Sequence, residues 1–419
     1  MKIEQRINYR LNKYPGLKKI FKRCYQLALF ALLPKIKSEG NIVRVSPDEP
    51  GEYFFGYYDK SPWDATGQYM LCMRAKDTWN EPDPLGEAEI LLIDTKGINT
   101  FKVIAKTHTW NVQQGCMAQW MGPDYSSRIL YNDLRDGKYC SVILEVKTGK
   151  ERVLPMPVYT LSNDGRTAVS LDFSRLHSLR LGYGYAALPE KTKGVALPNE
   201  TCIWKMDVES GEVTPLLKYT DFAKFEPRPE MQEVGSFHKV NHLMLSPNGK
   251  RFMVLYRWFV GQRKYTRLIT CNVDGTEMYV LSDDDMVSHC YWKNDEEIIA
   301  FERKKEYGPG FYLMKDKTQE WTHIWPQLSN DGHPSYCPLD NSLVVFDTYP
   351  SRSRIQEVKL GRDNDIEGNS VKTIVKVFSP FKYDNDTRCD LHPRWSRDGK
   401  KVCFDSVFEG CRGLYVVNI

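Results

Sequence analysis

The sequence predicts an all-β fold, a seven-bladed β-propeller preceded by a basic amphipathic helical arm. Three observations carry this prediction: a turn-and-strand unit that recurs seven times, short apolar runs between the units, and no long amphipathic helix pattern beyond residue 40. The composition agrees, because 12% aromatic residues with 28 Gly and 23 Pro are typical of strands joined by tight turns.

Each unit contains an aromatic or apolar residue, a polar turn of the Ser-x-Asp-Gly-Lys type and an apolar run. The seven copies begin at Pro62, Gln119, Thr160, Met244, Tyr291, Tyr336 and Arg394. Repeats of roughly 40–60 residues are typical of propeller blades. A four-stranded blade cannot bury both faces alone, so blades stack around a closed ring. An open two-domain β-sandwich is the competing architecture.

We expect two parts, an arm over residues 1–40 and a propeller over residues 41–419. The chain ends in what reads as the third strand of the seventh blade. Residues 41–46 are therefore predicted to supply the outer strand of that blade and to close the ring.

The arm carries ten Lys or Arg against Glu4 and Glu39, a net charge of +8, so about −4 of the total +4 belongs to the rest. The body therefore gives no reason to expect nucleic-acid binding. The apolar run over residues 24–33 is too short to span a bilayer, which needs about 20 residues. Pro34 follows where a signal peptide needs small residues. We expect an amphipathic helix on an anionic membrane surface; a helix packed on the body is the alternative.

The number and spacing of the cysteines indicate whether the protein works in a reducing or an oxidising compartment. There are eleven, an odd number without CxxC spacing, which favours a reducing environment over a disulfide framework. With the basic arm, this favours a cytoplasmic protein, peripheral on the inner face of the membrane.

Four of the eight histidines occupy one position in the repeat. Four residues before the Ser position of each turn stand Lys60, Met117, Val158, His242, His289, His333 and His392. This position begins the innermost strand, which lines the channel of a propeller. The second strand returns to the same rim, where it carries Arg74, Asp172, Tyr256, Arg257, Arg303, Asp347 and Asp405. Polar groups converging on a channel mouth form the candidate site. The alternative is that the histidines only hydrogen-bond neighbouring blades.

These residue types favour a particular chemistry. Three neutral imidazoles can hold a divalent transition metal such as Mn or Zn, and a fourth can act as a base. Arg74, Arg257 and Arg303 suit a carboxylate, which a guanidinium matches bidentately. Tyr183 and Tyr256 can stack on a sugar or donate a phenolic proton. Together they fit β-elimination of a uronate glycan, in which the carboxylate must be neutralised before the neighbouring proton is removed.

The segments His333-Pro-Ser-Tyr and His392-Pro-Arg-Trp-Ser, with the rim histidines, resemble the oligogalacturonate lyases and more loosely the ulvan lyases. The resemblance covers residues 50–419 by architecture and scattered residues. It implies a seven-bladed propeller that degrades acidic polysaccharide, with a manganese site at His289, His333 and His392. It also implies His242 or His238 as the base and Arg257 as the carboxylate partner.

Gln114 is expected as a polar rim contact beside these residues. The closely paired His ligands of the resembled family are absent from this sequence. The most consistent function is a polysaccharide or oligosaccharide lyase acting on an acidic, uronate-containing glycan. The alternative is a membrane-associated glycan-binding or glycan-assembly protein of surface polysaccharide biosynthesis without lyase activity. A protein-interaction propeller fits less well, because the rim mixes His, Arg and Tyr.

Overall fold

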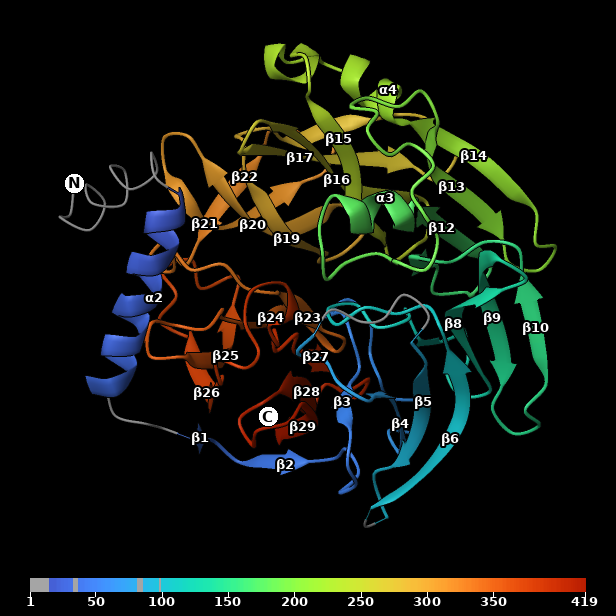
Figure 1. The fold of residues 1–419 in the computed structure, drawn as a ribbon, viewed down its shortest axis with the longest axis vertical. Helices are drawn as coiled ribbons and strands as arrows, with labels where there is room; N and C mark the ends of the chain where they lie inside the picture. Colours follow the sequence, from blue (N-terminus) through green and yellow to red (C-terminus); the bar gives the residue numbers. More distant parts are fainter. Residues whose placement is uncertain (1–14, 33–36, 81–85, 98) are drawn as a thin grey trace.

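The computed structural model describes residues 15–32, 37–80, 86–97 and 99–419. Seven antiparallel sheets stand around a central axis and form a closed ring (Figure 1). This confirms the seven-bladed propeller predicted from the repeat. Six sheets have four strands and one has five.

The strands of each blade run in chain order from the channel outward, except that the outermost strands of blades 6 and 7 are β1 and β2 from the start of the chain. Blades 1 to 3 consist of β3 (Glu52–Phe54), β4 (Tyr69–Ala75), β5 (Ala88–Asp94), β6 (Thr100–Thr107); β7 (Gln119–Trp120), β8 (Arg128–Arg135), β9 (Lys138–Glu145), β10 (Glu151–Leu154); and β11 (Thr160–Leu161), β12 (Thr167–Leu171), β13 (Thr201–Asp207), β14 (Val213–Lys218). Blades 4 and 5 consist of β15 (Phe237–Leu245), β16 (Arg251–Val260), β17 (Arg263–Asn272), β18 (Tyr279–Ser282); and β19 (Val287–Trp292), β20 (Glu297–Lys304), β21 (Gly308–Lys315), β22 (Trp321–Ile324). Blades 6 and 7 consist of β23 (Ser335–Cys337), β24 (Asp340–Asp347), β25 (Ile355–Arg362), β26 (Lys372–Phe378), β1 (Ser38–Glu39); and β27 (Arg394–Trp395), β28 (Lys401–Ser406), β29 (Gly413–Asn418), β2 (Ile42–Arg44).

The two ends of the propeller meet in blade 7. Strand β2 pairs antiparallel with β29, with Ile42 opposite Val417, which confirms that residues 41–46 provide the outer strand. Strand β1 pairs with β26 of blade 6, although its residues lie within the range expected for the arm. The propeller therefore begins earlier than predicted. At the inner edge of the closure, the buried ion pair between Arg394 and Asp405 (3.1 Å) also holds the backbone N–H of Phe55 from blade 1.

The repeated turn residues join neighbouring blades. The indole nitrogens of Trp120, Trp292 and Trp395 each donate to a backbone oxygen of the preceding blade at 2.9–3.0 Å. In the turns themselves, a Ser hydroxyl such as that of Ser246 accepts from the backbone N–H five residues later. The sequence repeat is therefore a repeat of inter-blade contacts and turn hydrogen bonds.

Helix α2 (Pro15–Leu32) lies outside the ring, beside blade 6 (Figure 1). Its Phe30 stacks on Phe378 at a centroid distance of 5.5 Å, and Arg23 pairs with Asp384 at 3.0 Å. Ile20 and Phe21 are exposed. Within the described ranges, no helix is long and apolar enough to cross a bilayer. The expected helix is present, and one side of it packs on the body.

The segments inserted around blade 3 approach the channel. They contain the short helices α3 (Phe173–Ser178) and α4 (Tyr219–Lys224) and the turn η1 (Pro229–Gln232); a second such turn, η2 (Asn385–Thr387), precedes blade 7. Asp172, expected on the rim, caps α3 by accepting from the N–H of Arg175. The chain after α3 carries Tyr183, whose ring contacts that of Tyr57 from blade 1.

Candidate functional site

The four histidines that share one repeat position meet in the channel. We call His242, His289, His333 and His392 the histidine cluster. Their ring centroids are 6.2 Å apart between His242 and His289, 3.9 Å between His289 and His333, and 4.3 Å between His333 and His392. All four side chains are buried. The shared register therefore brings together residues that are up to 150 positions apart in the sequence.

The backbone at this repeat position is unusual. Met117, His242 and His392 adopt a left-handed conformation, with φ of 58°, 62° and 45°. At His242 the pairing of β15 with β16 is interrupted between Asn241 and Met244. Left-handed non-glycine residues are costly, and they concentrate at functional sites. Here the distortion accompanies side chains that enter the channel.

Tyr57 and Tyr58 fill the space between the histidines. The Tyr57 hydroxyl lies 3.0 Å from Nδ1 of His242, and the Tyr58 hydroxyl lies 2.7 Å from its Nε2. The Nε2 atom is also 3.1 Å from the backbone oxygen of Cys290. Burial lowers the pKa of His242 to about 3. His242 is therefore a neutral imidazole whose two nitrogens both have partners within the protein.

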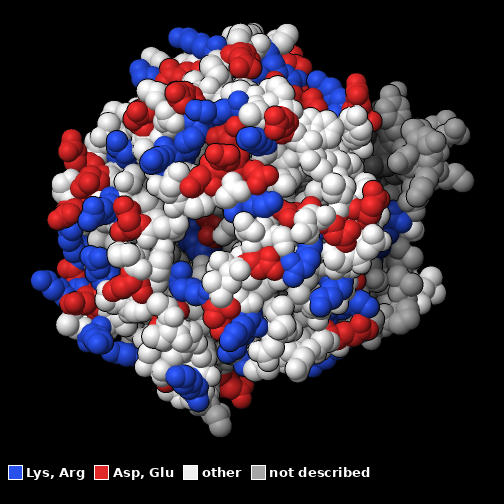
Figure 2. All heavy atoms as spheres, turned by 180° about the vertical axis from the view of Figure 1, so that it is seen from behind, with Lys and Arg blue, Asp and Glu red and all other residues white. Residues whose placement is uncertain are grey.

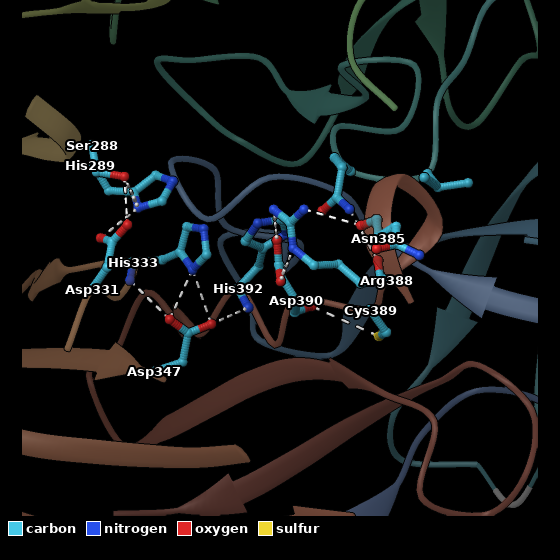
Figure 3. Close-up of polar contacts among 12 residues, drawn as sticks. Ser288, His289, Asp331, His333, Asp347, Asn385, Arg388, Cys389, Asp390 and His392 are labelled. Carbon is cyan, nitrogen blue, oxygen red and sulfur yellow. Dashed lines mark hydrogen bonds and ion pairs between the residues drawn. The ribbon is translucent and has the colours of Figure 1, made fainter. Parts of the chain in front are cut away.

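His333 and His392 are oriented by groups behind them (Figure 3). Asp347 accepts from Nδ1 of His333 at 2.8 Å and from the backbone N–H of His392 at 3.0 Å. Nδ1 of His392 lies 3.0 Å from the backbone oxygen of Gly56. The Nε2 atoms of both rings are buried and have no hydrogen-bond partner in the described structure. Metal-binding histidines are typically held in this way, with the second nitrogen on a carboxylate or carbonyl.

Asp390 completes a set of three potential metal ligands. One ligand atom each from His333, Asp390 and His392 lies within 4.8 Å of the others, and all three residues are buried. Arg388 binds the same carboxylate at 2.9 Å and fixes its position. Burial would lower the pKa of His333, but the neighbouring carboxylates, Asp347 foremost, raise it above its usual value. Two imidazoles and a carboxylate are ligands suited to Mn or Zn.

His289 has a carboxylate partner of its own. Its Nδ1 lies 3.0 Å from Oδ1 of Asp331, and the Ser288 hydroxyl donates to the other oxygen of that carboxylate at 2.5 Å (Figure 3). Burial, followed by the fields of His333 and His242, lowers the pKa of His289. The ring is thus held neutral, with Nε2 away from Asp331.

The other residues expected at the site fall into two groups. Arg257, Gln114 and Tyr183 are buried near the histidine cluster: Gln114 donates to the Tyr159 hydroxyl at 2.8 Å, and Nε and Nη1 of Arg257 have no partner among the described residues. Burial, and then the charge of Arg180, lowers the pKa of Arg257 to about 10.

The second group consists of Arg74, Arg303, His238 and Tyr256. Among the described residues, none of these four side chains contacts the histidine cluster. Arg74 pairs with Glu49 and Glu89, and Arg303 is exposed on β20. His238 and Tyr256 are buried against each other, with Nδ1 of His238 2.5 Å from the Tyr256 hydroxyl and its Nε2 3.2 Å from the backbone oxygen of Met231.

A separate cavity lies at the end of the channel away from the histidine cluster. Its volume is about 580 Å³, and it is lined by the repeated turns and by Asp59, Lys60, Arg394 and Arg397. A hollow with basic and acidic side chains is visible at the centre of the ring in Figure 2. Tyr58 lines this cavity and also contacts the histidine cluster, so it separates the two halves of the channel.

Comparison with known proteins supports the fold. No protein-family model matches the sequence, and no curated protein matches it. Among solved structures, an oligogalacturonate lyase from Vibrio parahaemolyticus is similar, with a TM-score of 0.62, 12% identity, and 90% of this chain and 93% of the other covered. An oligogalacturonate lyase solved in complex with manganese has a TM-score of 0.62 and 14% identity over 92% of this chain and 98% of its own. The β-propeller domain of the Trilobed protease from Pyrococcus furiosus has a TM-score of 0.50 and 13% identity over 87% and 96%.

Proposed function

We propose that the chain is a metal-dependent lyase that cleaves an acidic, uronate-containing glycan by β-elimination at the histidine cluster. The observation that carries this proposal is the set His333, Asp390 and His392. In both imidazoles Nδ1 is hydrogen-bonded to the protein, to Asp347 and to Gly56 respectively. Their Nε2 atoms are buried and have no hydrogen-bond partner among the described residues. The fold similarity to an oligogalacturonate lyase solved with manganese agrees with it.

His333, Asp390 and His392 would hold the divalent metal. When bound, the metal would neutralise a uronate carboxylate and so make the neighbouring C–H proton acidic enough to remove. The orienting residues Asp347 and Gly56 keep both imidazoles in the required tautomer. His333 lies just before β23, and Asp390 and His392 lie just before β27, so each ligand is carried by the segment that leads into an inner strand.

His289 is the base in this proposal. The resemblance to known lyases placed it among the metal ligands, but Asp331 holds its Nδ1 and its Nε2 has no hydrogen bond among the described residues. A neutral imidazole with one nitrogen on a carboxylate can accept a proton at the other. His242, whose nitrogens are both occupied by Tyr57 and Tyr58, is less able to do so.

Tyr57 can donate the second proton. Burial, and then the neighbouring Tyr183, raises its pKa well above 10, so it stays a protonated phenol. In the elimination, the proton beside the carboxylate moves to Nε2 of His289, and the freed electron pair forms the carbon–carbon double bond. The bond to the leaving glycan oxygen breaks, and that oxygen takes the phenolic proton.

The proposal is tested by incubating the purified chain with oligosaccharides of galacturonate, glucuronate and mannuronate. We expect ultraviolet absorbance from a 4,5-unsaturated uronate on at least one of them in the presence of Mn²⁺. Chelation should abolish the signal, and added Mn²⁺ should restore it. Binding of an oligosaccharide without any unsaturated product would instead support the glycan-binding alternative.

We also propose that α2 contacts an anionic membrane surface. Ile20 and Phe21 are exposed, at 62% and 57%, although Phe30 of the same helix packs on blade 6. Replacing both with Glu should strongly reduce sedimentation with vesicles containing phosphatidylserine, because it removes apolar contact and adds like charge. Val153→Glu, at a similarly exposed apolar position on β10, is the matched control and should sediment normally. Equal sedimentation of all three proteins would contradict membrane contact through α2.

A further inference from the structure

Blade 4 carries buried basic side chains without carboxylate partners among the residues that the structure describes. Lys239 on β15 lies directly opposite Arg257 on β16, so the two side chains stand on the same face of the sheet. Lys264 on β17 pairs with Phe259, two residues beyond Arg257, and therefore shares that face. Lys239 is 1% exposed and Arg257 is 3% exposed. Like charges directly opposite each other destabilise a sheet, and burial without a counter-charge adds to the cost.

Most other buried arginines in the described part of the chain are paired with a carboxylate. Arg394 is paired with Asp405, Arg175 with Glu190 and Arg267 with Asp283. In contrast, Lys239 donates to the backbone oxygen of Leu179 at 3.3 Å and lies over the Phe259 ring at 5.4 Å, with no carboxylate partner in the described ranges. No carboxylate within the described residues forms an ion pair with Arg257. Arg412 also lacks a carboxylate, but it donates to three backbone oxygens, whereas Nε and Nη1 of Arg257 have no partner among the described residues.

Two further cations extend the group to the surface. Arg180, which follows α3 and lies over the Tyr183 ring at 4.3 Å, is half-buried, and Lys264 is exposed. The hydrogen bond from Lys239 to the backbone oxygen of Leu179, the residue before Arg180, places Arg180 beside Lys239. The pKa of Lys264 is lowered to about 7, first by Arg257, then by partial desolvation and then by Arg180, while Asp331 raises it. Arg180, Lys239, Arg257 and Lys264 form what we call the cationic set.

We propose that the cationic set is a subsite for a doubly charged phosphate group carried by the glycan substrate. A single uronate carboxylate brings one negative charge and would leave most of the set unpaired. A phosphate monoester brings about two charges and three acceptor oxygens, which suit an Arg fork together with Lys point charges. This inference rests on the proposed function only in placing the phosphate on the same glycan that enters the histidine cluster.

The subsite is tested by calorimetric titration of the full chain at constant ionic strength. The probes are inorganic phosphate, glucose 1-phosphate and an unphosphorylated galacturonate trimer. We expect phosphate and glucose 1-phosphate to bind, and Lys239→Met and Arg257→Met each to weaken that binding by roughly 10- to 100-fold. Tighter binding of glucose 1-phosphate than of inorganic phosphate identifies a sugar-linked group as the ligand. The reverse order, or binding of the trimer alone, overturns the assignment to a glycan phosphate.

Stability provides a second measurement that a structural role would not reproduce. Without phosphate, Lys239→Met should raise the melting temperature, because it removes a buried amine that has no carboxylate partner in the described structure. Arg251→Met is the matched control on β16, the strand that carries Arg257: Arg251 is paired with Asp316 at 2.7 Å, so its loss should lower the melting temperature and leave phosphate binding unchanged. A lower melting temperature for Lys239→Met, or unchanged phosphate affinity in both set variants, overturns the proposal. Product formation from unphosphorylated uronates tests the lyase separately, so either idea can fail alone.

Discussion

Replacing His289 with alanine should lower kcat for the unsaturated product by about 10²–10⁴-fold, the range expected when a positioned base is lost. His289 lies outside the metal-ligand set, and its Nδ1 is held by the Asp331 carboxylate at 3.0 Å. Metal binding should be retained, because His333, Asp390 and His392 are untouched. Steady-state kinetics and metal titration on the same protein check both statements.

Two companion variants sharpen this test. Asp331→Asn should reduce kcat with little change in KM, since the carboxylate positions His289 without touching substrate. His323→Ala, on β22 with its ring stacked on Tyr312 at 4.4 Å, should keep wild-type activity. If His289→Ala loses metal together with activity, His289 is a ligand, as the family resemblance implied. If it retains full activity, the base is another residue.

Replacing Asp347 with asparagine should weaken Mn²⁺ binding by about 10- to 100-fold, the usual effect of removing a residue that orients metal ligands. Asp347 accepts hydrogen bonds from the ring of His333 and from the backbone of both His333 and His392, so one change loosens two ligands. Calorimetric titration of the chelator-treated protein measures the affinity. Activity at saturating Mn²⁺ should recover in part.

The control for this variant is the same substitution at another buried carboxylate of blade 6. Asp363 accepts from the Tyr336 hydroxyl at 2.8 Å and pairs with Lys293, with no contact to the histidine cluster. Asp363→Asn should leave Mn²⁺ affinity unchanged. Equal affinities of wild type and Asp347→Asn would show that the metal is bound elsewhere or not at all.

The ring and the meeting of the four histidines were predictable because a propeller repeats. Each turn fixes where an inner strand begins, so equal spacing from the turn means equal position around the channel. Asp390 stands two residues before His392, and Asp331 stands two residues before His333. This shared Asp-x-His pattern could have identified both aspartates as site residues, but the prediction was based on the histidines alone.

Other features depend on side-chain direction, which a count along the chain does not give. Arg74, Arg257 and Arg303 follow their turns by similar distances, yet only Arg257 is buried near the cluster, because a shift of one residue turns a side chain to the other face. Tyr57 and Tyr58 enter the channel from blade 1 after Gly56, whose φ of 131° redirects the chain. The repeat pattern contains no feature that predicts this bend, so the two tyrosines could not be placed in the channel from the sequence.

The pairing of β2 with β29 has a consequence for how the molecule is made. Ile42 and Val417 are more than 370 residues apart, yet they are neighbours in one sheet. During synthesis at about 5–20 residues per second, the early strand must wait on the order of twenty seconds to a minute for its partner to leave the ribosome. Until then the edge of β2 is unpaired, and we expect the nascent chain to bind chaperones that protect exposed strand edges.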